Sequence, residues 1–163
     1  MSVVPSSMTN KFEAAGWFPG RTIEVAPAVP FDHPAHAVLA EIGGLTLSNP
    51  ASNICSVAFR HVTEGASDLA EWEAALGTDM VGFAEEDDGH ATVYLSGRGH
   101  VFGCSNVHPA VFLIGRTIGE ALNALGSGRR AQPMLLPDED EIALYGVTFR
   151  QGDREVIVPS GLA

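Results

Sequence analysis

Residues 92–103 constrain the fold of this chain more than any other segment. Two runs suited to β-strands, residues 92–95 and 100–103, flank the sequence Ser96-Gly97-Arg98-Gly99. A short link with two glycines favours a tight turn, because glycine adopts positive φ angles at little steric cost. The pattern therefore predicts a β-hairpin, which requires antiparallel pairing and excludes an all-helical fold.

Strands and helices follow one another along the rest of the chain without regular alternation. Further strands are expected at residues 45–47, 54–59, 80–84, 111–114, 142–149 and 155–158, with a turn at 85–89 and another at 151–153. Helices are expected at about residues 10–15, 32–42, 67–76 and 118–125. This arrangement in 163 residues predicts a single α+β domain, in which several short helices pack against a central, mainly antiparallel sheet.

Capping residues mark where the predicted helices begin. Thr9 or Asn10 is expected to cap the first helix and Asp32 the second, because their side chains accept hydrogen bonds from free backbone amides. Thr117 followed by Glu120 predicts a capping box on the last helix. The apolar stripes of these elements also predict a buried core, with Trp17, Leu39, Leu45, Trp72, Phe102, Leu122 and Leu125 as members.

The charge of the chain is strongly negative and unevenly distributed. The formal net charge is −11, and residues 64–88 contain nine acidic residues with no Lys or Arg among them. Residues 138–141 add four more acids. Such a chain is expected to bind neither nucleic acid nor anionic membranes, because phosphate affinity depends on clustered cations. Two interpretations of residues 64–88 remain open: an acidic binding surface, or a solvated helix face and turn.

The sequence contains no set of residues that predicts catalysis, a cofactor or a metal. His33 and His36 lack a third ligand at a motif spacing, and are interpreted as first-turn residues of a surface helix. Cys104 lies four residues before His108, which leaves open a third hypothesis, a small enzyme with a cysteine nucleophile. The more economical interpretation of Cys104 is a small buried apolar residue. Neither a phosphate-binding loop nor a dinucleotide fingerprint occurs.

The sequence has no segment that predicts export or membrane insertion. No apolar run approaches the roughly 20 residues needed to cross a bilayer. Residues 1–10 lack the basic start and apolar stretch of a signal peptide. Two cysteines are too few to hold a fold together by disulfides. These features predict a cytoplasmic protein.

Two segments in the first third of the chain resemble a known family. Residues 12–21, FEAAGWFPGR, resemble the AGWxPGR opening of the third subfamily of SUKH immunity proteins. Residues 39–45, LAEIGGL, are similar to its L-x-E-F-G-G-L segment, with Ile42 where Phe is common. Both motifs also have structural interpretations. Gly16 can end a helix with Trp17 folded back on it, and Arg21 can bond backbone carbonyls or a carboxylate.

Weaker similarities follow in the order that the family has them. Residues 80–82 resemble its P-[IV]-G strand, although Met80 replaces the proline. Asp88-Gly89 with residues 91–95 is similar to its D-x-x-G-x-V-Y hairpin, and residues 119–125 resemble its closing helix. The expected domains are therefore residues 1–128, the SUKH-like domain, and residues 129–163, a strand-containing C-terminal extension packed on it.

The resemblance implies an α+β fold and a function in binding, without catalytic residues. SUKH proteins look like antidotes that neutralise toxins deployed between competing bacteria, often nucleases or nucleic-acid deaminases. The expected partner is thus a basic protein toxin domain. A SUKH-like scaffold or regulatory module that binds an endogenous protein is the alternative, and the oligomeric state is left open. The predicted partner-binding residues are Asp68, Glu71, Glu73, Glu85, Glu86, Asp87 and Asp88.

Overall fold

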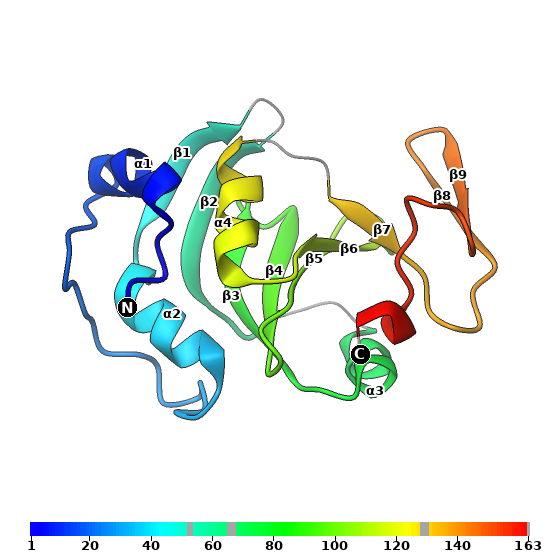
Figure 1. Ribbon diagram of the computed structural model, residues 1–163, viewed down its shortest axis with the longest axis horizontal. Helices are drawn as coiled ribbons and strands as arrows, with labels where there is room; N and C mark the ends of the chain where they lie inside the picture. Colours follow the sequence, from blue (N-terminus) through cyan, green and yellow to red (C-terminus); the bar gives the residue numbers. More distant parts are fainter. Residues whose placement is uncertain (52–53, 65–67, 128–130, 163) are drawn as a thin grey trace.

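The fold is α+β, with one long antiparallel sheet at its centre (Figure 1). A computed structural model describes residues 1–51, 54–64, 68–127 and 131–162. In this part of the chain the main sheet has seven strands, each pairing with its neighbour in sequence: β1 (Thr46–Ala51), β2 (Ile54–Val62), β3 (Met80–Glu86), β4 (Ala91–Ser96), β5 (Val101–Ser105), β6 (Val111–Gly115) and β7 (Gln132–Met134). The predicted fold class is confirmed.

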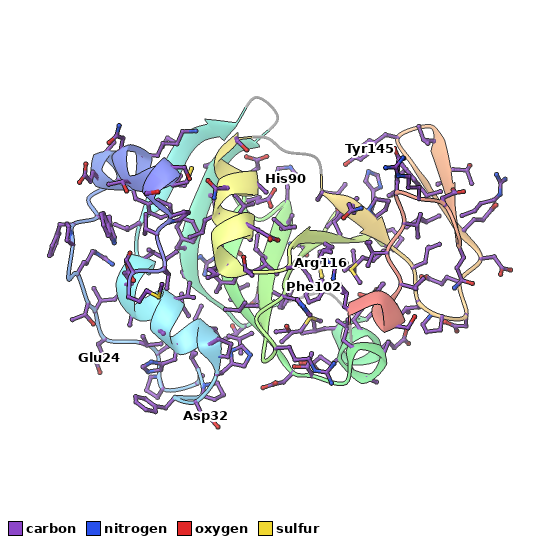
Figure 2. All side chains as sticks on the ribbon, in the orientation of Figure 1. Glu24, Asp32, His90, Phe102, Arg116 and Tyr145 are labelled. Atoms are coloured by element: carbon purple, nitrogen blue, oxygen red, sulfur yellow. The ribbon has the colours of Figure 1, made fainter. Side chains whose placement is uncertain are left out.

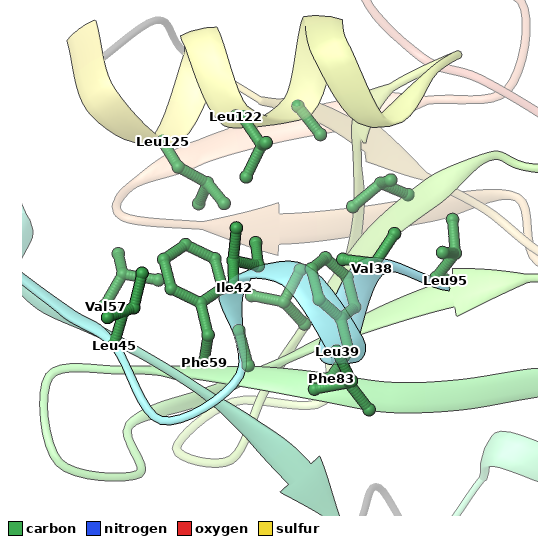
Figure 3. Packing of buried hydrophobic residues seen from close by; sticks show 14 of the residues in the cluster. Val38, Leu39, Ile42, Leu45, Val57, Phe59, Phe83, Leu95, Leu122 and Leu125 are labelled. Carbon is green, nitrogen blue, oxygen red and sulfur yellow. The ribbon is translucent and has the colours of Figure 1, made fainter. Parts of the chain in front are cut away.

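Helices cover both faces of this sheet. The helical segments are η1 (Ser6–Met8), α1 (Thr9–Ala14), α2 (Pro34–Ile42), α3 (Leu69–Leu76), α4 (Ile118–Ser127) and η2 (Pro159–Leu162). Helices α2 and α4 share the larger apolar core, where Leu122 and Leu125 of α4 point toward Phe59 and Phe83 of the sheet (Figure 3). Helix α3 and η2 belong to a second core on the opposite face, with Trp72 and Phe102. Every residue predicted to be buried is buried.

The hairpin at residues 92–103 forms as predicted. Tyr94 pairs with Phe102 and Leu95 with Val101, and the Ser96 amide donates to the His100 carbonyl at 2.9 Å. Gly99 has a φ of +89°, which glycine adopts without strain. Local sequence alone accounts for this pairing.

Strand β3 differs from its prediction in both length and regularity. It was expected to end at Ala84, with residues 85–89 as a turn, but it continues to Glu86. Gly82 pairs with Tyr94 while Ala84 pairs with Val93, so Phe83 is an extra residue in a β-bulge. A bulge shifts the alternation of side chains by one residue, because successive residues in a strand face opposite ways. Glu86 therefore faces the α4 side of the sheet and Glu85 the other side.

Residues 12–21, which resemble the opening motif of the family, make contacts that stabilise the fold. Gly16 has a φ of +99° and follows α1, and the Trp17 amide donates to the Phe12 carbonyl at 2.8 Å. The Trp17 indole Nε1 donates to Glu41 Oε1 at 3.1 Å. The Arg21 guanidinium donates to the carbonyls of Glu41 and Gly43, which satisfies backbone acceptors at the end of α2. Of the two partners expected for Arg21, the carbonyls are the ones observed.

Two predicted N-caps are wrong. Helix α1 continues directly from η1, so Met8 occupies its N-cap in place of Thr9 or Asn10. At α2 the cap is His33 and not Asp32: His33 Nδ1 accepts from the Ala35 amide at 3.1 Å. His33 is only 5% exposed, which corrects its interpretation as a surface residue. The imidazole can take the cap because an unprotonated ring nitrogen is an acceptor like a hydroxyl oxygen.

The α4 capping box is close to its prediction. Thr117 Oγ1 accepts from the Glu120 amide at 3.2 Å. Glu120 Oε2 accepts in return from the amide of Arg116, at 2.9 Å, one residue before the position that the motif predicts. Both hydrogen bonds satisfy amides that a helix start leaves free.

The C-terminal part of the chain is folded differently from its prediction. Residues 142–149 are not one strand but most of a hairpin of β8 (Glu141–Leu144) and β9 (Val147–Arg150). The chain turns at Tyr145 and Gly146, with φ of +51° and +80°. The predicted strand at 155–158 is also wrong, since only Ile157 forms an isolated bridge, to Met134. The prediction missed β7, the three-residue strand that pairs with β6.

Candidate functional site

The predicted acidic residues form two groups at opposite ends of β3. Asp68, Glu71 and Glu73, here called the α3 acids, lie on the helix that precedes the strand. Glu85, Glu86, Asp87 and Asp88, here called the β3–β4 acids, lie where the strand ends. A strand of seven residues spans about 20 Å. Glu73, which is bonded at the start of the strand, is therefore separated from the β3–β4 acids by the length of β3.

The α3 acids differ in how much of their charge is free for a partner. Glu73 Oε1 accepts from the Met80 amide at 2.8 Å, which ties α3 to the start of β3. Asp68 occupies the N-cap of α3 without a side-chain cap hydrogen bond and is partly buried. Glu71 is exposed in the first turn, where the helix dipole favours an acid. Glu73 thus has a clear structural role.

Two of the β3–β4 acids are accounted for by local contacts, and a third is exposed at the turn. Glu85 forms an ion pair with Arg60 of β2, so a base outside residues 64–88 compensates this charge. Asp87 Oδ1 accepts from the Ser56 amide at 3.0 Å, which holds the β3–β4 turn against β2. Asp87 and Asp88 both have positive φ, and Asp88 is exposed at the tip. The turn comprises residues 87–90, because Glu85 and Glu86 belong to the strand.

Glu86 lines a groove of about 680 Å³ between the sheet, α4 and the β8–β9 hairpin. Its apolar lining comes from Phe112 and Ile114 of β6, Leu125 of α4, and Leu144 and Phe149 of the hairpin. Its polar lining is Glu86, Asp87, His90, Ser105, His108 and Tyr145. Helix α4 and the β8–β9 hairpin flank the groove. Figure 2 shows His90 beside α4 and Tyr145 on the hairpin.

The carboxyl of Glu86 is in an unfavourable environment for a charge. Burial, reinforced by the neighbouring charge of Asp87, raises the pKa of Glu86 from 4.5 to about 7. None of the described residues that line the groove is a Lys or Arg. A half-buried carboxylate without a cation beside it loses hydration and forms no ion pair that would compensate, so its protonated form is favoured.

The rim of the groove carries exposed rings. Tyr145 is 83% exposed, and its ring meets that of His108 edge to face, with centroids 5.9 Å apart. His90 Nδ1 donates to the carbonyl of Asp87, which fixes the imidazole at the β3–β4 turn. Val107, 60% exposed, also lines the groove. The rim therefore combines aromatic and apolar surface with carboxylates.

The structure opposes a catalytic pair of Cys104 and His108. Cys104 is 1% exposed and packs in the core that contains Trp72, while His108 lines the groove on the other face of the sheet. Burial, with a smaller effect of Asp68, raises the pKa of the Cys104 thiol to about 12. The reactive thiolate is therefore scarcely populated at neutral pH.

The described ranges of the chain have neither the side-chain clusters of a metal site nor a helix of the kind that spans a membrane. Among those residues, no group of three or more His, Cys, Asp and Glu side chains could hold a metal ion. Within the same ranges, no helix has the length and hydropathy to cross a bilayer.

The groove itself could not be found from the sequence. In the sequence, His108 stands out only as a possible partner of Cys104, and Tyr145 falls inside the strand expected at residues 142–149. Glu86 is predicted as a partner-binding residue, but within a turn at residues 85–89 and not on a strand that faces a groove. The only relevant signal was the Tyr145-Gly146 pair, whose glycine is compatible with a hairpin turn.

One comparison with known proteins found a match. A family model described as SUKH-3 immunity protein matches residues 4–128 of this chain. Neither the curated proteins nor the solved structures contain a match.

Proposed function

Because the chain belongs to the SUKH-3 immunity protein family, we propose that it binds a protein toxin and neutralises it without catalysis. The family match over residues 4–128 is the observation that carries the proposal. The toxin that fits best is one that acts on nucleic acid, a nuclease or a deaminase. Such an enzyme must present Lys and Arg to phosphates, and a chain of net charge −11 is attracted to that surface.

We propose that both groups of acids contribute to the encounter with the toxin, in unequal ways. Glu71 and Asp88 are exposed, so they act mainly through long-range attraction, which accelerates association and weakens with salt. Glu73, Glu85 and Asp87 also hold the fold together through Met80, Arg60 and Ser56. The bases and amides that they contact reduce the charge that they offer to a partner.

The first experiment asks whether this chain is an antidote. The reading frames beside its gene are examined for a large secreted protein, and the C-terminal domain of such a protein is expressed in bacteria with and without the chain. Rescue of growth, together with a complex of the two purified proteins, is the expected result. A chain that neither rescues growth nor binds that domain contradicts the proposal and favours a module for an endogenous partner.

The second experiment separates the two groups of acids. One variant combines Asp68→Asn with Glu71→Gln, and the other combines Glu85→Gln with Asp88→Asn. Association rates with the toxin domain are measured at low and high salt. A group that steers the encounter gives a slower rate with a weaker salt dependence when neutralised. A group whose loss changes neither quantity is a solvated surface only.

The third experiment tests the absence of catalysis. Cys104→Ser is expected to leave neutralisation intact, because the thiol is buried and lies on the opposite face of the sheet from His108. Loss of neutralisation in a variant with normal unfolding behaviour would contradict a function by binding alone.

A further inference from the structure

The groove beside α4 has the composition of a protein-binding surface. Its floor is apolar, with Phe112, Ile114 and Leu125, while Tyr145 and Val107 stand exposed at its rim. Aromatic residues around a concave apolar centre are typical of the positions that dominate binding energy between proteins. The volume of about 680 Å³ is enough for a few inserted side chains of a partner.

The negative charge of the groove indicates that a cationic side chain should bind in it. Glu86 and Asp87 line it, and no Lys or Arg occurs among its described lining residues. Asp87 is already bonded to the Ser56 amide, whereas no hydrogen bond or ion pair to the Glu86 carboxyl occurs in the described chain. The carboxylate is half-buried beside apolar side chains, where an incoming cation would gain more than at a fully exposed acid.

We propose that this groove receives a protruding segment of the toxin, in which a Lys or Arg pairs with Glu86 and flanking apolar side chains contact Phe112, Ile114 and Tyr145. A second copy of this chain is a poor occupant, because two chains of net charge −11 repel each other. The inference rests on the proposed function for the identity of the partner.

Glu86→Gln is the central variant, since it removes the charge and keeps the shape of the side chain. Dissociation from the toxin domain is expected to accelerate roughly 10- to 100-fold, because a cation is left in the groove without its partner. Tyr145→Ala should also accelerate dissociation, by about fivefold or more. Glu85→Gln, on the adjacent residue but the opposite face, should act mainly on the association rate.

Glu13→Gln is the matched control. Glu13 is an exposed glutamate on α1, at the other end of the molecule from the β8–β9 hairpin (Figure 1). This variant removes the same charge and should change both rates by less than about twofold. If the toxin domain binds but Glu86→Gln and Tyr145→Ala dissociate like the parent chain, the groove proposal is wrong while the proposed function stands.

A second measurement does not require the toxin. Random twelve-residue peptides displayed on phage are selected on the immobilised full chain. The expected sequences carry a Lys or Arg flanked by apolar residues, bind the Glu13→Gln variant normally, and lose binding to Glu86→Gln. Enrichment of peptides without a cation, equal binding to Glu86→Gln, or no enrichment at all would each overturn the proposal.

Discussion

Glu85 and Glu86 have the same side chain and adjacent positions, but opposite surroundings. Glu85 faces Arg60 across the strand pair and is compensated by it. Glu86 faces the groove and has its pKa raised to about 7 by burial and by Asp87. The difference arises from which face of the sheet each residue occupies, and it makes Glu86 the residue whose replacement is most informative.

The raised pKa of Glu86 predicts that folding stability depends on pH. The folded state holds the proton of this carboxyl more tightly than the unfolded state, so stability falls as the pH rises from 4.5 through about 7. Glu86→Gln should therefore gain about 1–3 kcal/mol at pH 8 and almost nothing below pH 4.5. Urea unfolding at both pH values measures this. An equal gain at both would mean that the charge is not responsible.

Replacing Trp72 tests how much the second core contributes to stability. It is 3% exposed on α3, packed with Leu76, Tyr94 and Phe102. Trp72→Ala should cost about 3–5 kcal/mol in the free energy of unfolding, because it removes a large buried ring and leaves a cavity. Phe18→Ala is the control, since Phe18 is 58% exposed and its loss should change stability by less than about 0.5 kcal/mol.

Strand β3 is the element on which the candidate site depends. The bulge at Phe83 turns Glu86 toward the groove, and Gly82 lies directly beside it. A Cβ added to Gly82 would approach the Val62 carbonyl oxygen to 2.8 Å and Val62 Cβ to 3.0 Å. The close approach of β2 to β3 at this point therefore requires a glycine.

Gly82→Ala should destabilise the fold by about 1–3 kcal/mol, because the carbonyl in contact belongs to the backbone and cannot move freely. Gly119→Ala is the matched control, since nothing lies within 4 Å of its added Cβ in α4. That variant should be neutral or up to about 1 kcal/mol more stable, as alanine favours helix. Thermal or urea unfolding measures both. Equal stability of the two variants would show that β2 and β3 adjust without cost.

At the scale of the whole molecule, the family match ends at residue 128 but the sheet does not. Strand β7 extends the sheet beyond β6, and Met134 and Leu162 are buried in the core that also contains Trp72. The β8–β9 hairpin forms one side of the groove. The C-terminal residues thus contribute both to the core and to the candidate site.

A chain that ends at residue 128 should therefore be much less stable than the full chain. Each of Met134 and Leu162 contributes roughly 1.5–3 kcal/mol by burial, and β6 would lose a paired neighbour. We expect a loss above about 3 kcal/mol, measured by urea unfolding. Stability within about 1 kcal/mol of the full chain would instead make residues 129–163 a separable extension.

Features that depend on residues close together in the chain could be predicted from the sequence. The hairpin at 92–103, the capped start of α4, the Gly16 stop and the buried faces of Trp72 and Leu122 all follow from local periodicity and glycine placement. The fold class follows from their order. The family motifs likewise lie within single short segments, so they were visible without any structure.

The position of the candidate site, in contrast, depends on contacts between distant parts of the chain. Residues 64–88 are a dense run of acids in the sequence, but the separation of Glu73 from the acids at 85–88 depends on how β3 extends. The bulge at Phe83 has no local signal, because it arises from pairing with β2 and β4. The groove further requires the β8–β9 hairpin to return beside β6. Contacts between residues far apart in sequence create these features, and patterns within short segments do not encode them.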